Sequence, residues 1–227
     1  MAFNKNSLIE VLEGVCKFED EVYPQNKDLF QSLAYDQSPP VLFITCADSR
    51  ISPGMITQTE PGELFIIRNV GNIVPAYGEM VGGVSSAIEY ALGILKVKNI
   101  IICGHSNCGA MHALLDLNSE KLNTMPTVRR WLMSAEAARA QFSDLRAEDA
   151  GPKDVQSLTE ANILLQLTHL KTHPAVAKAL SRNEVSIEGW YYDIKNGKIS
   201  VIDEDTGKFI PSKEMLKILK TRKNSKE

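Results

Sequence analysis

The sequence has few of the residues that mark secreted or membrane-spanning proteins. Only four cysteines occur in 227 residues, Cys16, Cys46, Cys103 and Cys108, which is too few for a disulfide framework. No apolar run approaches the roughly 20 residues that a membrane-spanning helix needs, and the first residues lack the apolar stretch of a secretory signal. We therefore expect a cytoplasmic protein with reduced cysteines, which makes metal binding or catalysis by cysteine worth testing.

The sequence also lacks an excess of positive charge. Lys and Arg number 25 against 28 Asp and Glu, for a formal net charge of −3. Because nucleic acids and anionic membrane surfaces attract basic proteins, we expect neither as a partner. With 44% hydrophobic residues, the chain is able to bury a substantial core. We expect one domain over residues 1–227 that acts on a small molecule.

Short apolar segments alternate with helical patterns along the chain. Residues 41–46, 64–68 and 99–103 are apolar and β-rich, as in buried strands. Residues 84–95 carry apolar side chains at helical spacing. This succession is typical of a parallel βαβ unit. We predict an α/β fold with a mostly parallel central sheet flanked by helices.

The two ends of the chain carry additional patterns. Residues 1–36 predict an N-terminal helical arm whose first helix has an apolar stripe, and residues 185–202 predict a C-terminal hairpin around Asn196-Gly197. The Lys- and Glu-rich residues 222–227 predict a frayed tail. Further helices are predicted at residues 28–34, 110–117, 128–142 and 158–180, the last interrupted at Pro174.

Two short segments concentrate residues that bind metals. Cys46 ends one predicted strand, while His105 and Cys108 follow another. Residues beyond the carboxyl ends of parallel strands converge on one crevice, where Gly104 and Gly109 would let the backbone approach closely. Zinc accepts two Cys and one His in tetrahedral geometry, and catalytic sites leave the fourth position open. The sequence therefore predicts zinc ligands at Cys46, His105 and Cys108.

The remaining cysteines and histidines have simpler interpretations. Cys16 and Cys103 lack metal-binding neighbours, and we expect both to be small core residues. His112, His169 and His173 have no cysteine as an immediate neighbour and lie in predicted helices or helix breaks. We expect them to be ordinary surface or core histidines.

Asp48 and Arg50 follow the first predicted zinc ligand at intervals of two residues. In an extended chain alternate side chains share a face, so both are able to approach the metal. A surface ion pair is the simplest alternative, but this position favours a catalytic pair. Arg50 would keep Asp48 ionised and oriented, and Asp48 would accept a hydrogen bond from hydroxide on the zinc.

At these residues the sequence resembles the β-class carbonic anhydrases. The resemblance rests on Cys-x-Asp-x-Arg and His-x-x-Cys, and it covers roughly residues 5–211. Further matching segments are Glu60-Pro61-Gly62-Glu63-Leu64-Phe65, Arg68-Asn69-Val70-Gly71-Asn72, Ala87-Ile88-Glu89-Tyr90-Ala91 and Gly189-Trp190. It implies reversible hydration of carbon dioxide to bicarbonate and a proton, with Zn²⁺ as cofactor.

The resemblance is closer to the plant-type branch, which includes cyanobacterial and bacterial members. It implies a substrate pocket formed by Gln37, Phe65, Val70, Tyr90 and Gly109. Gln37, Phe65 and Tyr90 are implied to reach the site from a neighbouring subunit, so a homodimer, or a higher oligomer of dimers, is expected.

One position also bears on regulation. In the branch that bicarbonate inhibits, a Trp three residues before the first zinc Cys helps to bind the anion, whereas this chain has Phe43. Phe has no N–H donor. The resemblance therefore implies a site in which Asp48 stays paired with Arg50.

Other functions remain compatible with these residues. Known relatives on this scaffold hydrolyse carbon disulfide or carbonyl sulfide, which also begins with attack on a linear triatomic carbon. A non-catalytic binding module stabilised by zinc would need a fourth protein ligand to close the site. A dithiol redox protein is disfavoured because no Cys-x-x-Cys occurs.

Overall fold

The computed structural model describes residues 5–80 and 82–224, and the chain divides into two compact units, residues 1–38 and 39–227. Within the described ranges, no helix has both the length and the apolar character required to cross a bilayer. Helix α12 continues to Asn224, so it includes the start of the expected frayed tail. The rest of that tail, residues 225–227, lies outside the described residues.

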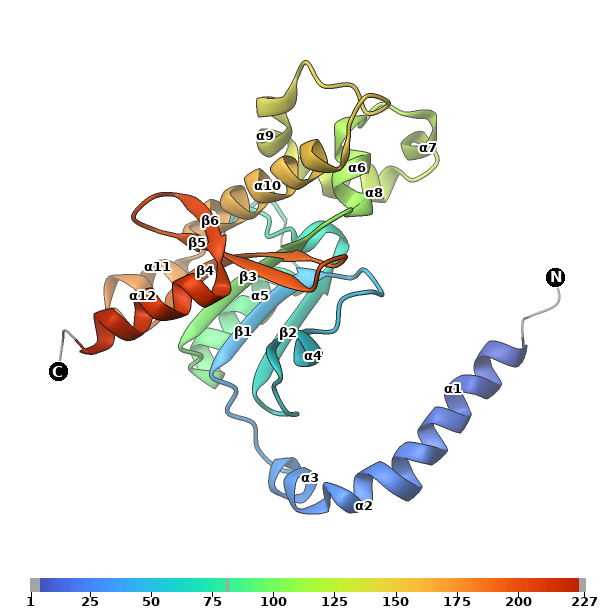
Figure 1. Ribbon diagram of the computed structural model, residues 1–227, viewed down its shortest axis with the longest axis vertical. Helices are drawn as coiled ribbons and strands as arrows, with labels where there is room; N and C mark the ends of the chain where they lie inside the picture. Colours follow the sequence, from blue (N-terminus) through green and yellow to red (C-terminus); the bar gives the residue numbers. More distant parts are fainter. Residues whose placement is uncertain (1–4, 81, 225–227) are drawn as a thin grey trace. The chain divides into compact units, whose positions relative to one another are not determined.

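The first unit consists of helices without a buried core. It contains α1 (Lys5–Lys17), the π-helical turn η1 (Phe18–Val22), α2 (Tyr23–Gln25) and α3 (Lys27–Leu33), coloured blue in Figure 1. None of residues 6–38 is buried. The apolar stripe of α1 is open to solvent, with Leu8 62% and Val11 63% exposed. Cys16 lies on this helix and is also exposed, so the expectation that it is a core residue is wrong. The reason is that α1 packs on no core within its own unit.

The second unit is organised around one six-stranded sheet in the order β2-β1-β3-β4-β5-β6 (Figure 1). The first four of these strands are parallel, and β5 and β6 are antiparallel. The strands are β1 (Val41–Cys46), β2 (Leu64–Asn69), β3 (Asn99–His105), β4 (Ser186–Asp193), β5 (Lys198–Asp203) and β6 (Lys208–Pro211). The predicted mostly parallel sheet and C-terminal hairpin are confirmed, and β6 adds a strand that the sequence did not indicate.

The helices of this unit lie along the sheet and beyond its carboxyl edge. The segments between β1 and β3 are α4 (Pro53–Thr57), η2 (Val70–Asn72), α5 (Gly83–Tyr90) and the π-helical turn η3 (Ala91–Leu95). After β3 come α6 (Gly109–Leu115), α7 (Glu120–Asn123), α8 (Pro126–Leu132), η4 (Met133–Ala135), α9 (Glu136–Arg139), η5 (Ala140–Phe142), α10 (Pro152–Thr172), α11 (Pro174–Ser181) and α12 (Ser212–Asn224). Pro174 separates α10 from α11, as predicted.

Alternate residues of the central strands pack into different clusters. Leu42, Ile44 and Ile102 lie in the main core with residues of α5, α10 and α11. Phe43 and Cys103 belong to a separate cluster with Trp190. Cys103 is thus the core residue that was expected. This alternation follows from the two-residue period of a strand, and it leaves the strand ends free to build a site.

The long helix α10 approaches the sheet closely because of a glycine. A Cβ on Gly104 of β3 would lie 2.8 Å from Thr159 Cγ2 and 2.9 Å from Ile163 Cδ1. Real Cβ atoms do not approach other heavy atoms so closely, so only glycine fits here without a shift of α10. The close packing brings the buried face of α10 to the strand end that carries His105.

One predicted helix is interrupted. Residues 128–142 form α8, η4, α9 and η5 instead of one continuous helix. Ala135 has φ −112° and ψ 6°, outside the helical region, and breaks the hydrogen-bonding pattern there. The bends follow the buried side chains of Leu132, Ala135 and Ala138, which lie in one cluster. Tertiary packing therefore overrides the high helix propensity of this alanine-rich segment.

Candidate metal centre

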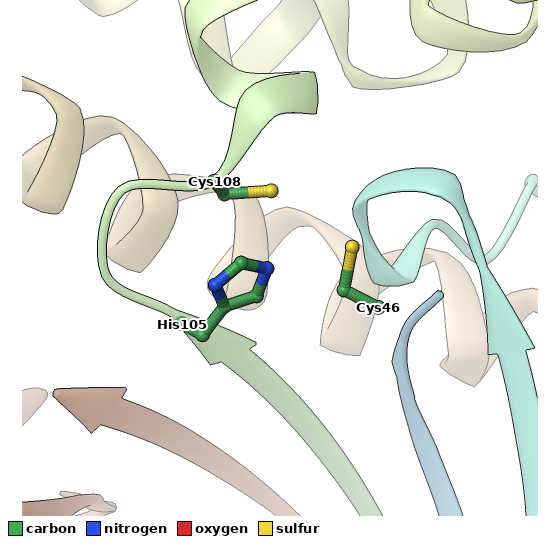
Figure 2. A group of neighbouring side chains, drawn as sticks. All are labelled: Cys46, His105 and Cys108. Carbon is green, nitrogen blue, oxygen red and sulfur yellow. The ribbon is translucent and has the colours of Figure 1, made fainter. Parts of the chain in front are cut away.

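Three potential metal ligands meet at the carboxyl edge of the sheet (Figure 2). Cys46 is the last residue of β1, His105 is the last residue of the adjacent parallel strand β3, and Cys108 caps α6. Their ligand atoms all lie within 4.8 Å of one another. Figure 2 shows the Cys46 and Cys108 sulfurs and the imidazole ring of His105 facing a common space. The structure thus brings together the three residues that the sequence singled out.

The loop between His105 and Cys108 is held in a tight turn. Asn107 adopts φ +52°, a left-handed conformation that Asn tolerates better than most residues. The Ser106 amide donates to the Tyr192 carbonyl over 2.8 Å, and the Ser106 hydroxyl accepts from the Ile194 amide over 3.0 Å. These bonds to the end of β4 fix the turn. As a result, Cys108 is directed back toward His105.

The imidazole of His105 is prepared to bind a cation. Its side chain is 1% exposed, and Nδ1 lies 2.9 Å from the Ser106 carbonyl oxygen. A carbonyl only accepts, so Nδ1 carries the proton and Nε2 presents its lone pair. Nε2 is buried and has no hydrogen-bond partner within the described chain. A buried acceptor without a partner is costly, and a metal ion would satisfy it.

The two thiols lie close enough to influence each other's protonation. Hydrogen bonding with Cys108 is the main influence that lowers the pKa of Cys46. Burial opposes this effect, while the Gly71 and Asp48 amides reinforce it. The hydrogen bond with Cys46 raises the pKa of Cys108, and burial raises it further. The pair therefore favours one thiolate and one thiol, and a divalent cation would displace the remaining proton.

Asp48 and Arg50 form a two-pronged ion pair beside these ligands. Arg50 donates from Nε to Asp48 Oδ1 over 2.9 Å and from Nη2 to Oδ2 over 2.7 Å. The hydrogen bond from Arg50 is the main cause that holds the pKa of Asp48 below its usual range. Asp48 Oδ2 also lies 3.8 Å from His105 Nε2. Asp48 is thus an ionised acceptor at the edge of the cluster.

Arg68 is a residue of the site that sequence reasoning did not select. From the neighbouring strand β2, it donates from Nε to the Cys46 carbonyl over 3.2 Å and from Nη2 to the Asp48 carbonyl over 2.6 Å. It therefore fixes the backbone on both sides of Ala47. The sequence offered one indication of its role, because Arg68 begins the segment Arg68-Asn69-Val70-Gly71-Asn72 that contributes to the family resemblance.

The expected substrate residues fall into three groups. Val70 and Gly109 follow β2 and Cys108 and so belong to the carboxyl edge, and Val70 is 42% exposed. Phe65 and Tyr90 pack together with ring centroids 6.0 Å apart. Gln37 belongs to the unit of residues 1–38. At Gly109 an added Cβ would meet open space, so close backbone approach does not explain that glycine.

The Phe65–Tyr90 pair lies some distance from the ligands of its own chain. In the β1–β2 register, Phe65 pairs with Leu42, whereas Cys46 pairs with Asn69. Four residues of strand correspond to about 13 Å at about 3.3 Å per residue. The pair is thus displaced toward the amino end of the sheet.

The histidines outside the ligand set have structural partners. His112 Nε2 lies 2.9 Å from Asn107 Oδ1, within the turn that joins His105 to Cys108. His169 Nδ1 lies 3.0 Å from the Val74 carbonyl, and His173 Nε2 lies 3.0 Å from the Pro75 carbonyl. The expectation of ordinary surface or core histidines describes them, although all three contact segments next to the site.

Comparison with known proteins identifies the family. The family model described as carbonic anhydrase matches residues 41–199. A carbonic anhydrase of Pseudomonas aeruginosa is 46% identical over 88% of this chain and 90% of its own length. Carbonic anhydrase 1 of Escherichia coli O157:H7 is 45% identical over 89% of this chain and 91% of its own length. Among solved structures, the β-carbonic anhydrase CcaA superposes with a TM-score of 0.86 at 41% identity, covering 90% of this chain and 99% of CcaA. The chain therefore belongs to the carbonic anhydrase family, in its β class.

Proposed function

We propose that Cys46, His105 and Cys108 bind the zinc ion with which this carbonic anhydrase hydrates carbon dioxide reversibly to bicarbonate and a proton. The observation that carries the assignment is three buried ligand atoms within 4.8 Å of one another, one of them an imidazole nitrogen without a partner. Two thiolates and one neutral imidazole suit zinc better than the oxygen-seeking Mg²⁺ or Ca²⁺.

The ligand set leaves room for chemistry. Three protein ligands leave a fourth tetrahedral position open, as in catalytic zinc sites. Zinc held there supplies Lewis-acid activation, which lowers the pKa of water toward 7 in favourable cases. The group of possible ligands in the described part of the chain has three members. This count disfavours a closed, purely structural site with a fourth protein ligand.

Asp48 and Arg50 orient the nucleophile in this proposal. Arg50 keeps Asp48 ionised by donating to both carboxylate oxygens, of which Oδ2 also lies 3.8 Å from His105 Nε2. Asp48 then accepts a hydrogen bond from the attacking water or hydroxide and aims its lone pair at carbon dioxide. Phe65, Val70 and Gly109 provide a weakly polar surface for this apolar substrate, and the Gln37 amide donates to its oxygen.

Hydrolysis of carbon disulfide or carbonyl sulfide is the second reaction that such a site would support. Two curated relatives that are 46% and 45% identical to this chain are named carbonic anhydrases. Their names favour carbon dioxide as the substrate.

We propose that the active unit is a homodimer or a higher oligomer of dimers, with Gln37, Phe65 and Tyr90 serving the site of a neighbouring subunit. The displacement of Phe65 by about 13 Å from its own metal centre supports this assignment. The arm of residues 1–38 buries none of its described apolar side chains, which favours a covering surface on another copy. Two related β-carbonic anhydrases of Sordaria macrospora are described as tetrameric.

We also assign the chain to the plant-type branch. Phe43 is fully buried and packs edge-on against Trp190, with ring centroids 5.9 Å apart. It offers no N–H donor for a bicarbonate ion. The intact Asp48–Arg50 pair agrees with a site that does not close by Asp48 moving onto the metal. The cytoplasm is the proposed compartment, because thiolate ligands need reducing conditions and all four cysteines are free.

Replacement of one proposed ligand tests the assignment. We expect Cys46→Ser to lower the zinc content and to abolish carbon dioxide hydration measured by stopped flow. Cys103→Ser is the matched control, because Cys103 lies in a different cluster and burial raises its pKa to about 12. The control should keep one zinc per chain. Full zinc occupancy in Cys46→Ser would show that the ligand set is wrong.

A further inference from the structure

The segment after β2 is a loop whose backbone is held almost entirely by side chains. Residues 70–77 carry no regular pairing beyond the short turn η2. Asn69 spans the turn, since its Nδ2 donates to the Ile73 carbonyl and its Oδ1 accepts from the Ile73 amide. The other contacts come from α8, from α10 and from His173, which lies between α10 and α11. They join Trp131 to Val70, Asn162 to Gly71, Gln166 and His169 to Val74, Thr172 to Tyr77, and His173 to Pro75.

One peptide of this loop connects the anchoring contacts to the metal centre. The Gly71 amide donates to Cys46 Sγ over 3.4 Å. The Val70 carbonyl belongs to the same planar peptide and points in the opposite direction. It accepts from Trp131 Nε1 over 2.7 Å. The peptide is thus held at both ends, by an indole N–H on one side and by a ligand sulfur on the other.

The next peptide is held from α10. The Gly71 carbonyl accepts from Asn162 Nδ2 over 3.1 Å, and Asn162 Oδ1 accepts from Gln166 Nε2 over 2.8 Å. Both side chains are fully buried. Their four-residue spacing places them on one face of the helix. The conformation of Gly71 between the two peptides is left-handed, with φ +78°.

The position of Gly71 leaves little freedom of movement. A Cβ there would lie 3.0 Å from Ala110 Cβ and 3.3 Å from Met111 Cε, both in α6, which begins directly after Cys108. Close packing alone would keep the loop near α6. It would not set the rotation of the peptide plane, which decides whether the N–H points at sulfur.

We infer that Trp131 and Asn162 are positioning residues for the metal centre, which hold the two peptides that flank Gly71 so that its N–H stays directed at Cys46. The inference rests on the proposed role of Cys46 as a ligand. An N–H donor to a thiolate stabilises the negative charge on sulfur and fixes the direction of its remaining lone pairs. Neither residue is one of the three proposed ligands or one of the expected substrate residues.

The test compares Trp131→Phe with Trp190→Phe in the full-length protein. Trp131→Phe keeps an aromatic ring and removes the N–H donor. We expect it to raise the zinc dissociation constant about tenfold in a chelator competition, in line with the loss of other contacts to ligands. Trp190 lies in the cluster of Phe43 and Cys103, so Trp190→Phe should leave the constant unchanged. Asn162→Leu should weaken zinc binding in the same direction as Trp131→Phe.

A spectroscopic measurement separates positioning from general stability. With Co²⁺ as the probe, the thiolate-to-cobalt charge-transfer band of Trp131→Phe should move to longer wavelength, because the sulfur lone pair loses its N–H partner. A variant that folds, binds zinc as the wild type does and leaves the band unmoved would overturn the inference. Absence of a Cys46-dependent band in the wild type would instead overturn the ligand assignment and the inference with it.

Discussion

The substitution Asp48→Asn separates an oriented acceptor from a structural ion pair. Asp48 Oδ1 accepts from the Arg50 amide over 3.0 Å and from Arg50 Nε over 2.9 Å, while Oδ2 accepts from Nη2 over 2.7 Å. An Asn side chain must place its NH₂ group at one of these positions. At Oδ1 it would lose two accepted bonds, and at Oδ2 only one. We therefore expect the NH₂ group to occupy the Oδ2 position.

The magnitude follows from this orientation. Oδ2 is the atom that lies 3.8 Å from His105 Nε2, so the substitution presents a donor where the nucleophile needs an acceptor. Loss of a positioned acid–base partner typically costs 10²–10⁴-fold. Because the proposed role of Asp48 is to orient the proton and not to remove it, we expect about a 100-fold lower kcat/KM, equivalent to about 2.7 kcal/mol. Stability should fall by only about 1 kcal/mol, since Arg50 is 44% exposed and solvent screens the pair.

The assay is stopped-flow carbon dioxide hydration on protein of measured zinc content. The matched control is Asp205→Asn, because Asp205 also accepts from an arginine, Arg222, but lies in the β5–β6 hairpin on the surface. The control should keep full activity. If Asp48→Asn bound one zinc per chain and stayed within threefold of the wild type, the reasoning about Oδ2 would be refuted.

Three further predictions concern stability, assembly and inhibition. Burial, with Glu204 nearby, raises the pKa of Glu188 to about 7, so the folded protein binds more protons than the unfolded chain between about pH 4.3 and 7 and loses stability as the pH rises through this range. Glu188→Gln should remove this loss, so in urea titrations at pH 8 its free energy of unfolding should exceed that of the wild type by about 1 kcal/mol. At pH 4 the two proteins should differ little, and equal stability at pH 8 would contradict the raised pKa. Activity per chain should fall on dilution as sedimentation velocity detects monomers, whereas a fully active monomer would disprove sharing of Tyr90. Bicarbonate should inhibit without cooperativity, because Asp48 stays paired with Arg50; a steeply sigmoidal inhibition curve would contradict this.

The strand ends that form the site could be predicted because the apolar runs of the sequence and the rules of parallel strand pairing indicate the same arrangement. Residues 41–46 form β1 with the predicted bounds, since Pro39-Pro40 and Ser52-Pro53-Gly54 limit the apolar run on both sides. The convergence of Cys46 with His105 follows from parallel pairing alone. These features need no knowledge of which side chains touch across the fold.

The anchoring of the Gly71 loop could not be predicted in the same way. Asn162 and Gln166 are polar residues in a helix, and in a sequence such residues indicate a solvated face. Both are instead fully buried, where they bind the Gly71 carbonyl and the Val74 amide. These partners lie more than 90 residues earlier in the chain, so no local pattern in the sequence indicates the contacts. The prediction that Cys16 is buried was wrong for the opposite reason. An apolar helical stripe indicates burial, but none of residues 6–38 is buried, so the described part of this unit forms no core that covers the stripe.

The side-chain anchoring of residues 70–77 has a consequence for hydrogen exchange. Loop amides usually exchange quickly, because transient local opening exposes them to water. Here the Ile73, Val74 and Tyr77 amides donate to Asn69, Gln166 and Thr172. Val74 and Tyr77 are thus released only when the loop separates from α10. Their protons should exchange at rates that follow the opening of this helix, so a loop would report on the integrity of the core beneath the metal centre.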